Sequence, residues 1–178
     1  MFTHKNIGTC LVLAALAACA ANTPSRPDAK FGRAASAQEV ATGDISIPPS
    51  GEGLPSGSGN AKQGEAVYLA KCQSCHGAKG VGRPADPLAG GAGSLASANP
   101  VRTVGSFWPY ATTLFDYTRR AMPVTNPMSL TNDEAYAVTA YVLHLNGIIS
   151  ESEEMNAKTL PQVKMPNRDG FVDWSRRY

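Results

Sequence analysis

Apolar side chains recur at helical spacing in three segments between residues 60 and 147. The clearest segment begins at Thr131, where Thr131 to Glu134 form a capping box with acidic residues in the first turn. One apolar face follows, made of Ala135, Val138, Val142 and Leu145. Asn146-Gly147 then ends the segment as helix C-termini commonly end. The pattern predicts a helix from Thr131 to this pair.

Two further helices are predicted upstream. The first runs from near Asn60 to Cys72, and Gly64 inside it indicates close backbone contact with another element, since an interior Gly costs up to about 1 kcal/mol relative to Ala. The second follows Pro109 and ends before Met122-Pro123, because the proline biases Met122 toward extended backbone. No segment alternates as a strand does, so the predicted fold class is all-α with long loops.

The N-terminus has the layout of a secretory signal peptide over residues 1–18. Lys5 precedes an apolar stretch from Ile7 to Ala18 that is shorter than the roughly 20 residues of a membrane span. Leu16-Ala17-Ala18-Cys19 resembles the bacterial lipobox, in which the cysteine is acylated. The alternative is ordinary cleavage near Ala18 that leaves Cys19 as a free thiol.

Acylation of Cys19 would anchor the protein to a membrane without spanning it, on the periplasmic side. Ala20 stands where an acidic residue commonly retains lipoproteins at the inner membrane, which favours the outer membrane.

Residues 19–59 are rich in Pro, Gly, Ser and Ala and have few large apolar side chains. Such a segment cannot bury enough apolar surface to offset its chain entropy, so it is predicted to be a disordered tether. About 40 flexible residues would span roughly 35 Å; a plain spacer of no tuned length is the alternative. The predicted domain covers 60–150, and the tail 151–178 is expected either to wrap this domain or to contact a partner.

The 178-residue chain has 17% charged residues and a formal net charge of +2, which suits one modest domain plus non-globular segments. Nucleic-acid binding is not expected, because it calls for a clustered basic stripe.

The chemistry centres on Cys72-Gln73-Ser74-Cys75-His76, since C-x-x-C-H is the attachment signature of c-type haem. Cys72 and Cys75 would form thioethers, and His76 would ligate the iron. A zinc half-site or a redox dithiol fits less well, because the chain offers no second Cys pair and no strand-helix context.

The second iron ligand decides between electron transfer and small-molecule chemistry. Met122 is favoured because it lies in an irregular segment between two predicted helices. The remaining candidates are Met128, Met155, Met165 and His144. The ring N–H of His76 also needs an acceptor, and the carbonyl of Pro87 is predicted for it, with a simple turn as the alternative.

The pattern as a whole resembles class I cytochrome c. The resemblance rests on Gly64, Tyr68, the C-x-x-C-H pentapeptide, Pro87-Leu88-Ala89-Gly90, Met122-Pro123 and Tyr141 in the last helix. It implies a small all-α domain wrapped around one covalent haem. It also implies that the first and last helices cross at Gly64, Tyr68 and Tyr141.

A narrower resemblance, from about Ala61 to Asp173, is to the cytochrome c subunit of the sulfane dehydrogenase of the Sox system. It is carried by Gly80 to Arg83, Leu88 to Gly91, Val104 to Thr112, Phe115 to Pro123 and Met165 to Phe171. It implies His76 and Met122 as axial ligands. Arg102, Trp108 and Tyr110 match positions near the haem propionates.

The same resemblance implies that electrons come from a molybdenum-cofactor sulfur dehydrogenase and leave to downstream cytochromes. The Sox subunit is often longer and can carry a second haem, so a sulfite dehydrogenase partner or a general carrier role stays open. The chain would need no catalytic site of its own. The competing hypothesis is a haem enzyme or gas sensor with an open sixth position.

Overall fold

The computed structural model describes residues 32–172 and 174, and its contacts divide the chain after Gly43. The N-terminal unit contains helix α2, Ala37–Gly43, which is exposed along its whole length. Ser36 starts this helix by accepting a hydrogen bond from the backbone N–H of Glu39, and Glu39 pairs with Arg33. The predicted signal peptide and Cys19 lie outside the described residues. The second unit begins at Asp44.

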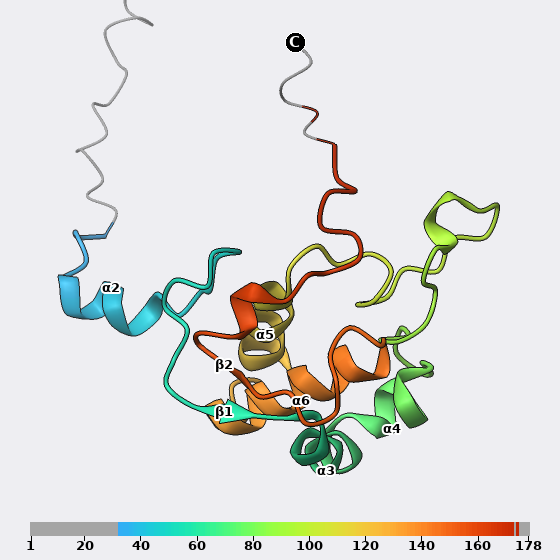
Figure 1. Ribbon diagram of the computed structural model, residues 1–178. Coiled ribbons are helices and arrows are strands. Elements are labelled where there is room, and N and C mark those ends of the chain that lie inside the picture. The colour runs from blue at the N-terminus through green and yellow to red at the C-terminus, as the bar shows by residue number, and fades with distance from the viewer. Residues whose placement is uncertain (1–31, 173, 175–178) are drawn as a thin grey trace, which may run out of the picture. The chain divides into compact units, whose positions relative to one another are not determined.

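Two capped helices form the centre of the second unit (Figure 1). Helix α3, Ala61–Lys71, starts at Asn60, which shares a reciprocal capping box with Gln63. Helix α6, Asn132–Leu145, starts at the predicted box of Thr131 and Glu134. Both predicted helices are therefore confirmed.

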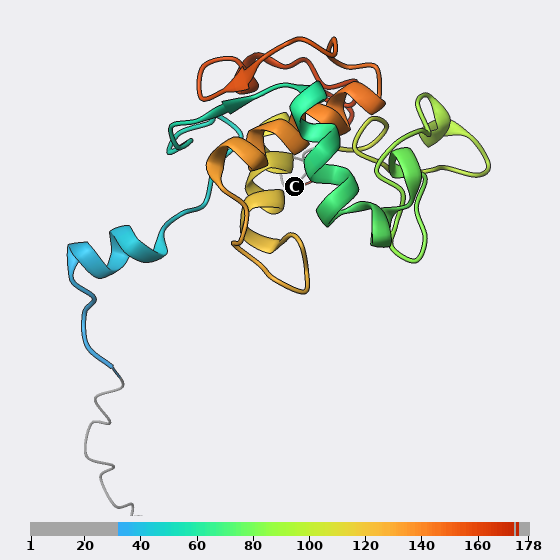
Figure 2. The same cartoon turned by 90° about the horizontal axis from the view of Figure 1, so that it is seen from below.

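Helices α3 and α6 cross, as Figure 2 shows from below, and Gly64 is where α3 meets α6 most closely. A Cβ at Gly64 would overlap the carbonyl oxygen of Ala137 and lie 2.9 Å from the Cβ of Tyr141. Beside the crossing, the rings of Tyr68 and Tyr141 have centroids 5.2 Å apart. The close contact predicted for Gly64 is confirmed, because only a residue without a side chain fits here.

Helix α5, Ala111–Ala121, packs on α6 and confirms the helix predicted between Pro109 and Met122. Its buried Phe115 contacts Tyr136 of α6, with ring centroids 4.4 Å apart. At its end Met122 has extended backbone angles (φ −114°, ψ 146°), as expected of a residue before proline.

The remaining elements are short. Helix α4, Gln73–His76, together with its N-cap residue Cys72 forms the C-x-x-C-H motif, and single 3-10 turns lie at Ala78–Gly80, Ser94–Ala96 and Leu160–Gln162. Strands β1, Ser58–Gly59, and β2, Met155–Asn156, pair antiparallel with Gly59 opposite Met155. The sequence predicted no strand, because two residues are too few to show alternation. The all-α class is otherwise confirmed.

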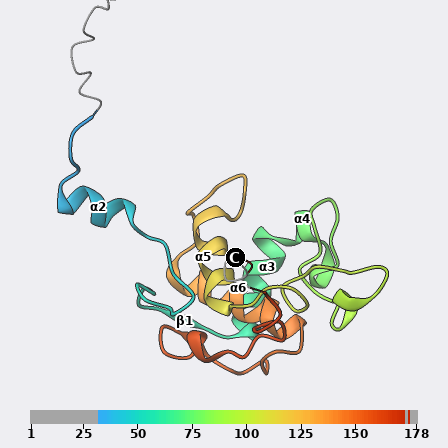
Figure 3. The same cartoon turned by 90° about the horizontal axis from the view of Figure 1, so that it is seen from above.

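Residues 45–59, predicted as part of a disordered tether, are packed on the helices. Ile47 is only 6% exposed and donates its backbone N–H to Asp116 on α5. Further along, Tyr136 donates its hydroxyl to Pro55 O, and Ser58 N–H donates to Asp133. The predicted domain start near Asn60 is therefore too late. We call residues 45–56 the strap; it leads into β1, as Figure 3 shows.

The C-terminal segment wraps the domain, which is one of the two arrangements expected for it. Met155, Leu160, Val163 and Met165 are all buried in the core. Beyond them, Asn167 donates its side-chain N–H to Phe107 O. The compact domain therefore extends well past the predicted boundary at residue 150.

Within the described part of the chain, no helix is long and apolar enough to cross a membrane.

Candidate haem site

The end of α3 leads directly into the C-x-x-C-H motif. Tyr68 is fully buried and donates its hydroxyl to Gly77 O at 2.8 Å, which ties α3 to the residue after His76. Burial raises the pKa of Tyr68 to about 12. The hydroxyl therefore stays protonated and keeps its role as a donor at neutral pH.

The motif itself forms one helical turn. The backbone N–H groups of Cys75 and His76 both donate to Cys72 O, at 3.1 and 3.0 Å. All three side chains are half-buried, so each has a free side and a packed side. Burial raises the pKa of the Cys72 thiol to about 11, which holds it as a neutral thiol. Two thiols and one imidazole on a single turn are the donor set that covalent haem requires.

The orientation of His76 supports this assignment. Its Nδ1 lies 2.9 Å from Asp86 O, which leaves Nε2 as the nitrogen for a metal. A ligating histidine almost always donates its other ring N–H to such an acceptor. The carbonyl predicted for this role was that of Pro87, and the structure corrects it to that of Asp86, one residue earlier.

The loop after the motif holds the turn in place. Gly82 N–H donates to His76 O at 2.8 Å, and Ala85 N–H donates to Cys75 O at 2.9 Å. Gly77 and Gly82 have positive φ angles (73° and 91°), and a Cβ on Gly77 would meet Gly82 O at 2.5 Å. This loop thus fixes the backbone of two motif residues and brings Asp86 to the imidazole.

Among the described residues, no group of three or more His, Cys, Asp or Glu side chains could hold a metal ion. The zinc alternative for Cys72 and Cys75 therefore gains no further ligand from this part of the chain.

The methionine candidates differ sharply in their surroundings. Met155 and Met165 are buried in the core, and Met128 is 66% exposed with a φ of 59°. His144 is half-buried with its Nδ1 near Ile149 O at 3.3 Å. Met122 is half-buried at the end of α5. Its ligation of the iron stays a prediction.

The segment after Met122 lies close to the haem motif. A cavity of about 380 Å³ separates the two, and residues from both sides line it: Ala70, Lys71 and Ser74 from the motif side, and Pro123, Thr125, Asn126 and Ser129 from the segment. The hydrogen bond from Asn126 N–H to Pro123 O, 2.8 Å, makes the start of this segment a turn. The fold thus brings the favoured methionine segment beside the motif.

The other three predicted contacts lie in the stretch that precedes α5. Trp108 packs edge-on against Tyr117 of α5, with ring centroids 6.0 Å apart. The guanidinium of Arg102 lies 5.4 Å from the ring centroid of Phe107, and that of Arg168 lies 4.2 Å from the ring centroid of Tyr110. Each of the three residues thus packs against a different neighbour, and their contact with haem stays a prediction.

Sequence reasoning missed Asp86 and Arg168. A backbone acceptor such as Asp86 O leaves no mark in the side-chain sequence. The contact of Arg168 with Tyr110 depends on how the tail folds back.

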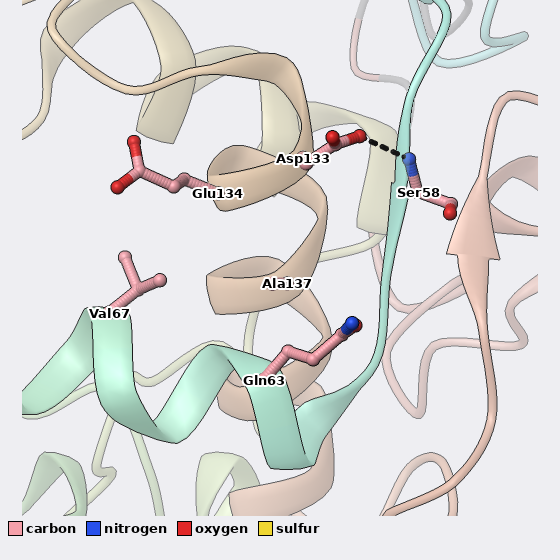
Figure 4. A pocket seen from close by; sticks show the side chains of 6 residues that line it. All are labelled: Ser58, Gln63, Val67, Asp133, Glu134 and Ala137. Atoms are coloured by element: carbon pink, nitrogen blue, oxygen red, sulfur yellow. Dashed lines mark hydrogen bonds between the residues drawn. The ribbon is translucent and has the colours of Figure 1, made fainter.

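A second cavity, of about 300 Å³, lies between β1, α3 and α6 (Figure 4). Asp133 and Glu134 line it, but Asp133 accepts from Ser58 N–H and Glu134 pairs with Lys71 at 2.6 Å. These carboxylates therefore serve the capping of α6 and the attachment of neighbouring segments.

Comparison with known proteins agrees with this geometry. Residues 59–142 match the family model described as cytochrome c oxidase, cbb3-type, subunit III. One similar chain comes from the crystal structure of the sulfane dehydrogenase SoxCD from Paracoccus pantotrophus. The two chains are 38% identical with a TM-score of 0.76, and the match covers 83% of this chain and 73% of the SoxCD chain. The comparison with curated proteins found no match.

The likeness to SoxCD extends over most of both chains, and the turn that carries Cys72, Cys75 and His76 has the donors of a covalent haem site. This chain belongs to the class I cytochrome c family, in the group of the cytochrome c subunit of sulfane dehydrogenase.

Proposed function

We propose that this protein carries single electrons on one covalently attached haem, as the acceptor subunit or partner of a molybdenum-dependent sulfite or sulfane dehydrogenase. The observation that carries the proposal is the C-x-x-C-H turn, with His76 oriented by Asp86 O, inside a fold similar to a SoxCD chain.

The residues have separate roles. Cys72 and Cys75 would hold the haem covalently, and His76 and Met122 would be the two protein ligands of its iron. Haem so bound supplies a one-electron iron couple whose potential depends on its axial ligands and surroundings. Asp86 O fixes the imidazole, and Tyr68 fixes the backbone that follows it. No acid or base of the chain takes part, because an electron transfer needs neither.

The partner is inferred from the similar structure, which is described as a sulfane dehydrogenase. The sequence resemblance leaves a sulfite dehydrogenase partner open as well, so the proposal covers both enzymes. Downstream cytochromes would receive the electrons.

We further propose a periplasmic location with a lipid anchor at Cys19, after removal of residues 1–18, and with the outer membrane favoured. The support is the lipobox-like sequence and the absence of an acidic residue at Ala20. Exchange of Cys19 for Ala is expected to move the protein from the membrane fraction to the soluble periplasmic fraction. Density-gradient separation of the two membranes checks the sorting.

Visible spectra of the exported haem-loaded protein, oxidised and then reduced, test the haem assignment. A c-type spectrum with a methionine-to-ferric-iron charge-transfer band, and no CO binding after reduction, is the expected result. Ready CO binding without that band means an open sixth position, and the gas-sensor or enzyme hypothesis then replaces the carrier.

Reduction by purified dehydrogenases tests the partner. The ferric protein is mixed with a sulfite dehydrogenase or a sulfane dehydrogenase and its substrate, and the ferrous spectrum is followed in time. Reduction that is no faster than with substrate alone, for both enzymes, contradicts the proposed partnership and leaves a general carrier.

A further inference from the structure

The strap is bonded to helix α5 along the whole length of that helix. Thr112 donates its hydroxyl to Pro49 O at 3.0 Å, Ile47 N–H donates to Asp116 at 2.8 Å, and the Arg119 guanidinium donates to Ile45 O at 3.5 Å. Strap positions 49, 47 and 45 thus meet helix positions 112, 116 and 119. The strap runs antiparallel to α5, from its first turn to its last.

Asp116 is the centre of this contact. It is 7% exposed, and one carboxylate oxygen accepts both Ile47 N–H from the strap and Arg120 Nε, the latter at 2.8 Å. The second oxygen pairs with the other arm of the Arg120 guanidinium. A buried carboxylate is costly unless it is paired and hydrogen-bonded, and here it has both kinds of partner. These bonds lower the pKa of Asp116 although burial alone would raise it.

The partners of Asp116 connect the strap to the proposed iron ligand. Arg120 stands two residues before Met122, in the last turn of α5. Met122 N–H donates to Thr118 O at 3.1 Å, so the backbone of Met122 is attached to the same last turn. A change in the direction or the fraying of this turn therefore moves Met122.

We infer that Asp116 is a positioning residue: it fastens the strap to α5 and orders the last turn of the helix, and so holds Met122 at the haem iron. The inference rests on the proposed function, because it takes Met122 as the ligand. It goes beyond that function, since neither the strap nor Asp116 belongs to the ligand set.

The test uses the full-length haem-loaded protein with Asp116→Ala, Asp116→Asn and Thr112→Val. Asp116→Ala removes the acceptor. Asp116→Asn keeps one side-chain oxygen but loses the charge. Thr112→Val removes only the hydrogen bond from Thr112 to Pro49 O. Glu52→Ala is the matched control, because Glu52 is an exposed acid in the same strap. Far-UV circular dichroism selects conditions in which every variant is folded.

Two readouts are taken on each folded variant. Hydrogen exchange of the Ile47 amide reports whether the strap is attached. The charge-transfer band of the ferric protein and CO binding by the ferrous protein report whether Met122 is in place. For Asp116→Ala we expect at least tenfold faster hydrogen exchange at the Ile47 amide than in the wild type. We also expect less than half of the wild-type intensity of the charge-transfer band, and CO binding by the ferrous protein. Asp116→Asn and Thr112→Val should show smaller changes in the same direction, and Glu52→Ala none.

Faster exchange at Ile47 with an unchanged band and no CO binding would show that the strap is merely structural, and would overturn this inference alone. A wild-type protein that lacks the band would instead overturn Met122 as the ligand, and with it the proposed carrier. Should Asp116→Ala fail to load haem, Thr112→Val and Asp116→Asn give the same comparison, because each retains Asp116 or an acceptor in its place.

Discussion

The methionines show how one residue type is sorted by its surroundings. Two are core residues, one is exposed, and Met122 alone of those after the haem motif is half-buried at a helix end. A buried thioether is held by packing contacts, and an exposed one has no structure to hold it toward a metal. Position in the fold therefore strengthens the case for Met122 over Met128.

Exchange of Met122 for Leu is expected to abolish the charge-transfer band and to let the ferrous protein bind one CO per haem. The reason is that leucine fills the same space but cannot ligate iron. Met128→Leu is the matched control and should leave both properties as in the wild type. Visible spectroscopy with CO titration measures both variants. Loss of the band and CO binding in Met128→Leu but not in Met122→Leu would identify Met128 as the iron ligand.

Tyr136 is a single buried residue that joins α6 to the strap through Pro55 O. Burial raises its pKa to about 12, whereas tyrosine in an unfolded chain titrates near 10. The folded state therefore keeps its proton where the unfolded state releases one. Its contribution to stability is complete below about pH 10 and is lost as the pH rises toward 12.

The free energy of unfolding of the wild type should accordingly fall between pH 10 and 12, and Tyr136→Phe should flatten that decline. At pH 7 the variant should lose about 1 kcal/mol with its hydrogen bond. Denaturant titrations at a series of pH values measure both effects. Tyr117→Phe, at a half-exposed tyrosine, is the control; an equal flattening there would remove Tyr136 as the cause.

At the scale of elements, the crossing of α3 and α6 depends on Gly64. A Cβ there overlaps the backbone of Ala137, so Gly64→Ala must push two helices apart. Alanine gains up to about 1 kcal/mol in helix propensity, but overpacking typically costs 1–3 kcal/mol and here strikes rigid backbone. The steric cost wins.

We expect Gly64→Ala to lower the free energy of unfolding by about 2 kcal/mol, measured by urea titration of the haem-loaded protein. Glu65→Ala, at the exposed neighbouring position of the same helix, should change it by less than about 0.5 kcal/mol. A neutral or stabilising Gly64→Ala would mean that the helices do not cross so closely.

At the scale of the whole molecule, two segments with little regular structure complete the core. The strap contributes Ile47, and the C-terminal segment contributes Met155, Leu160, Val163 and Met165. Removal of a buried large aliphatic side chain costs about 2–5 kcal/mol, and a domain of this size has only about 5–15 kcal/mol in all. The C-terminal segment is therefore part of the domain.

Truncation after Thr159 removes three of those buried side chains and should prevent accumulation of stably folded haem protein. Truncation after Trp174, which keeps all the described residues and the contact of Phe171 with Phe107, should retain near-normal yield and thermal stability. The yield of covalent haem and the melting temperature of each form measure the difference. A stable form ending at Thr159 would contradict the assignment of the tail to the core.

The sequence by itself determined the features that depend on neighbouring residues. The C-x-x-C-H spacing predicts covalent haem, the capping box at Thr131 predicts the start of α6, and Met122-Pro123 predicts the end of α5. Each of these is local chemistry or local backbone geometry. Gly64 belongs with them, because a glycine inside a helix already indicates a close neighbour.

Only the tertiary structure decided what the irregular segments do. The strap is poor in large apolar residues, yet backbone and side-chain hydrogen bonds to Asp116, Thr112 and Tyr136 hold it on the helices. Composition cannot show such bonds, because their partners lie more than 60 residues away in the chain. The acceptor of the His76 ring N–H is likewise a backbone oxygen, at Asp86, which only the path of the loop brings to the imidazole.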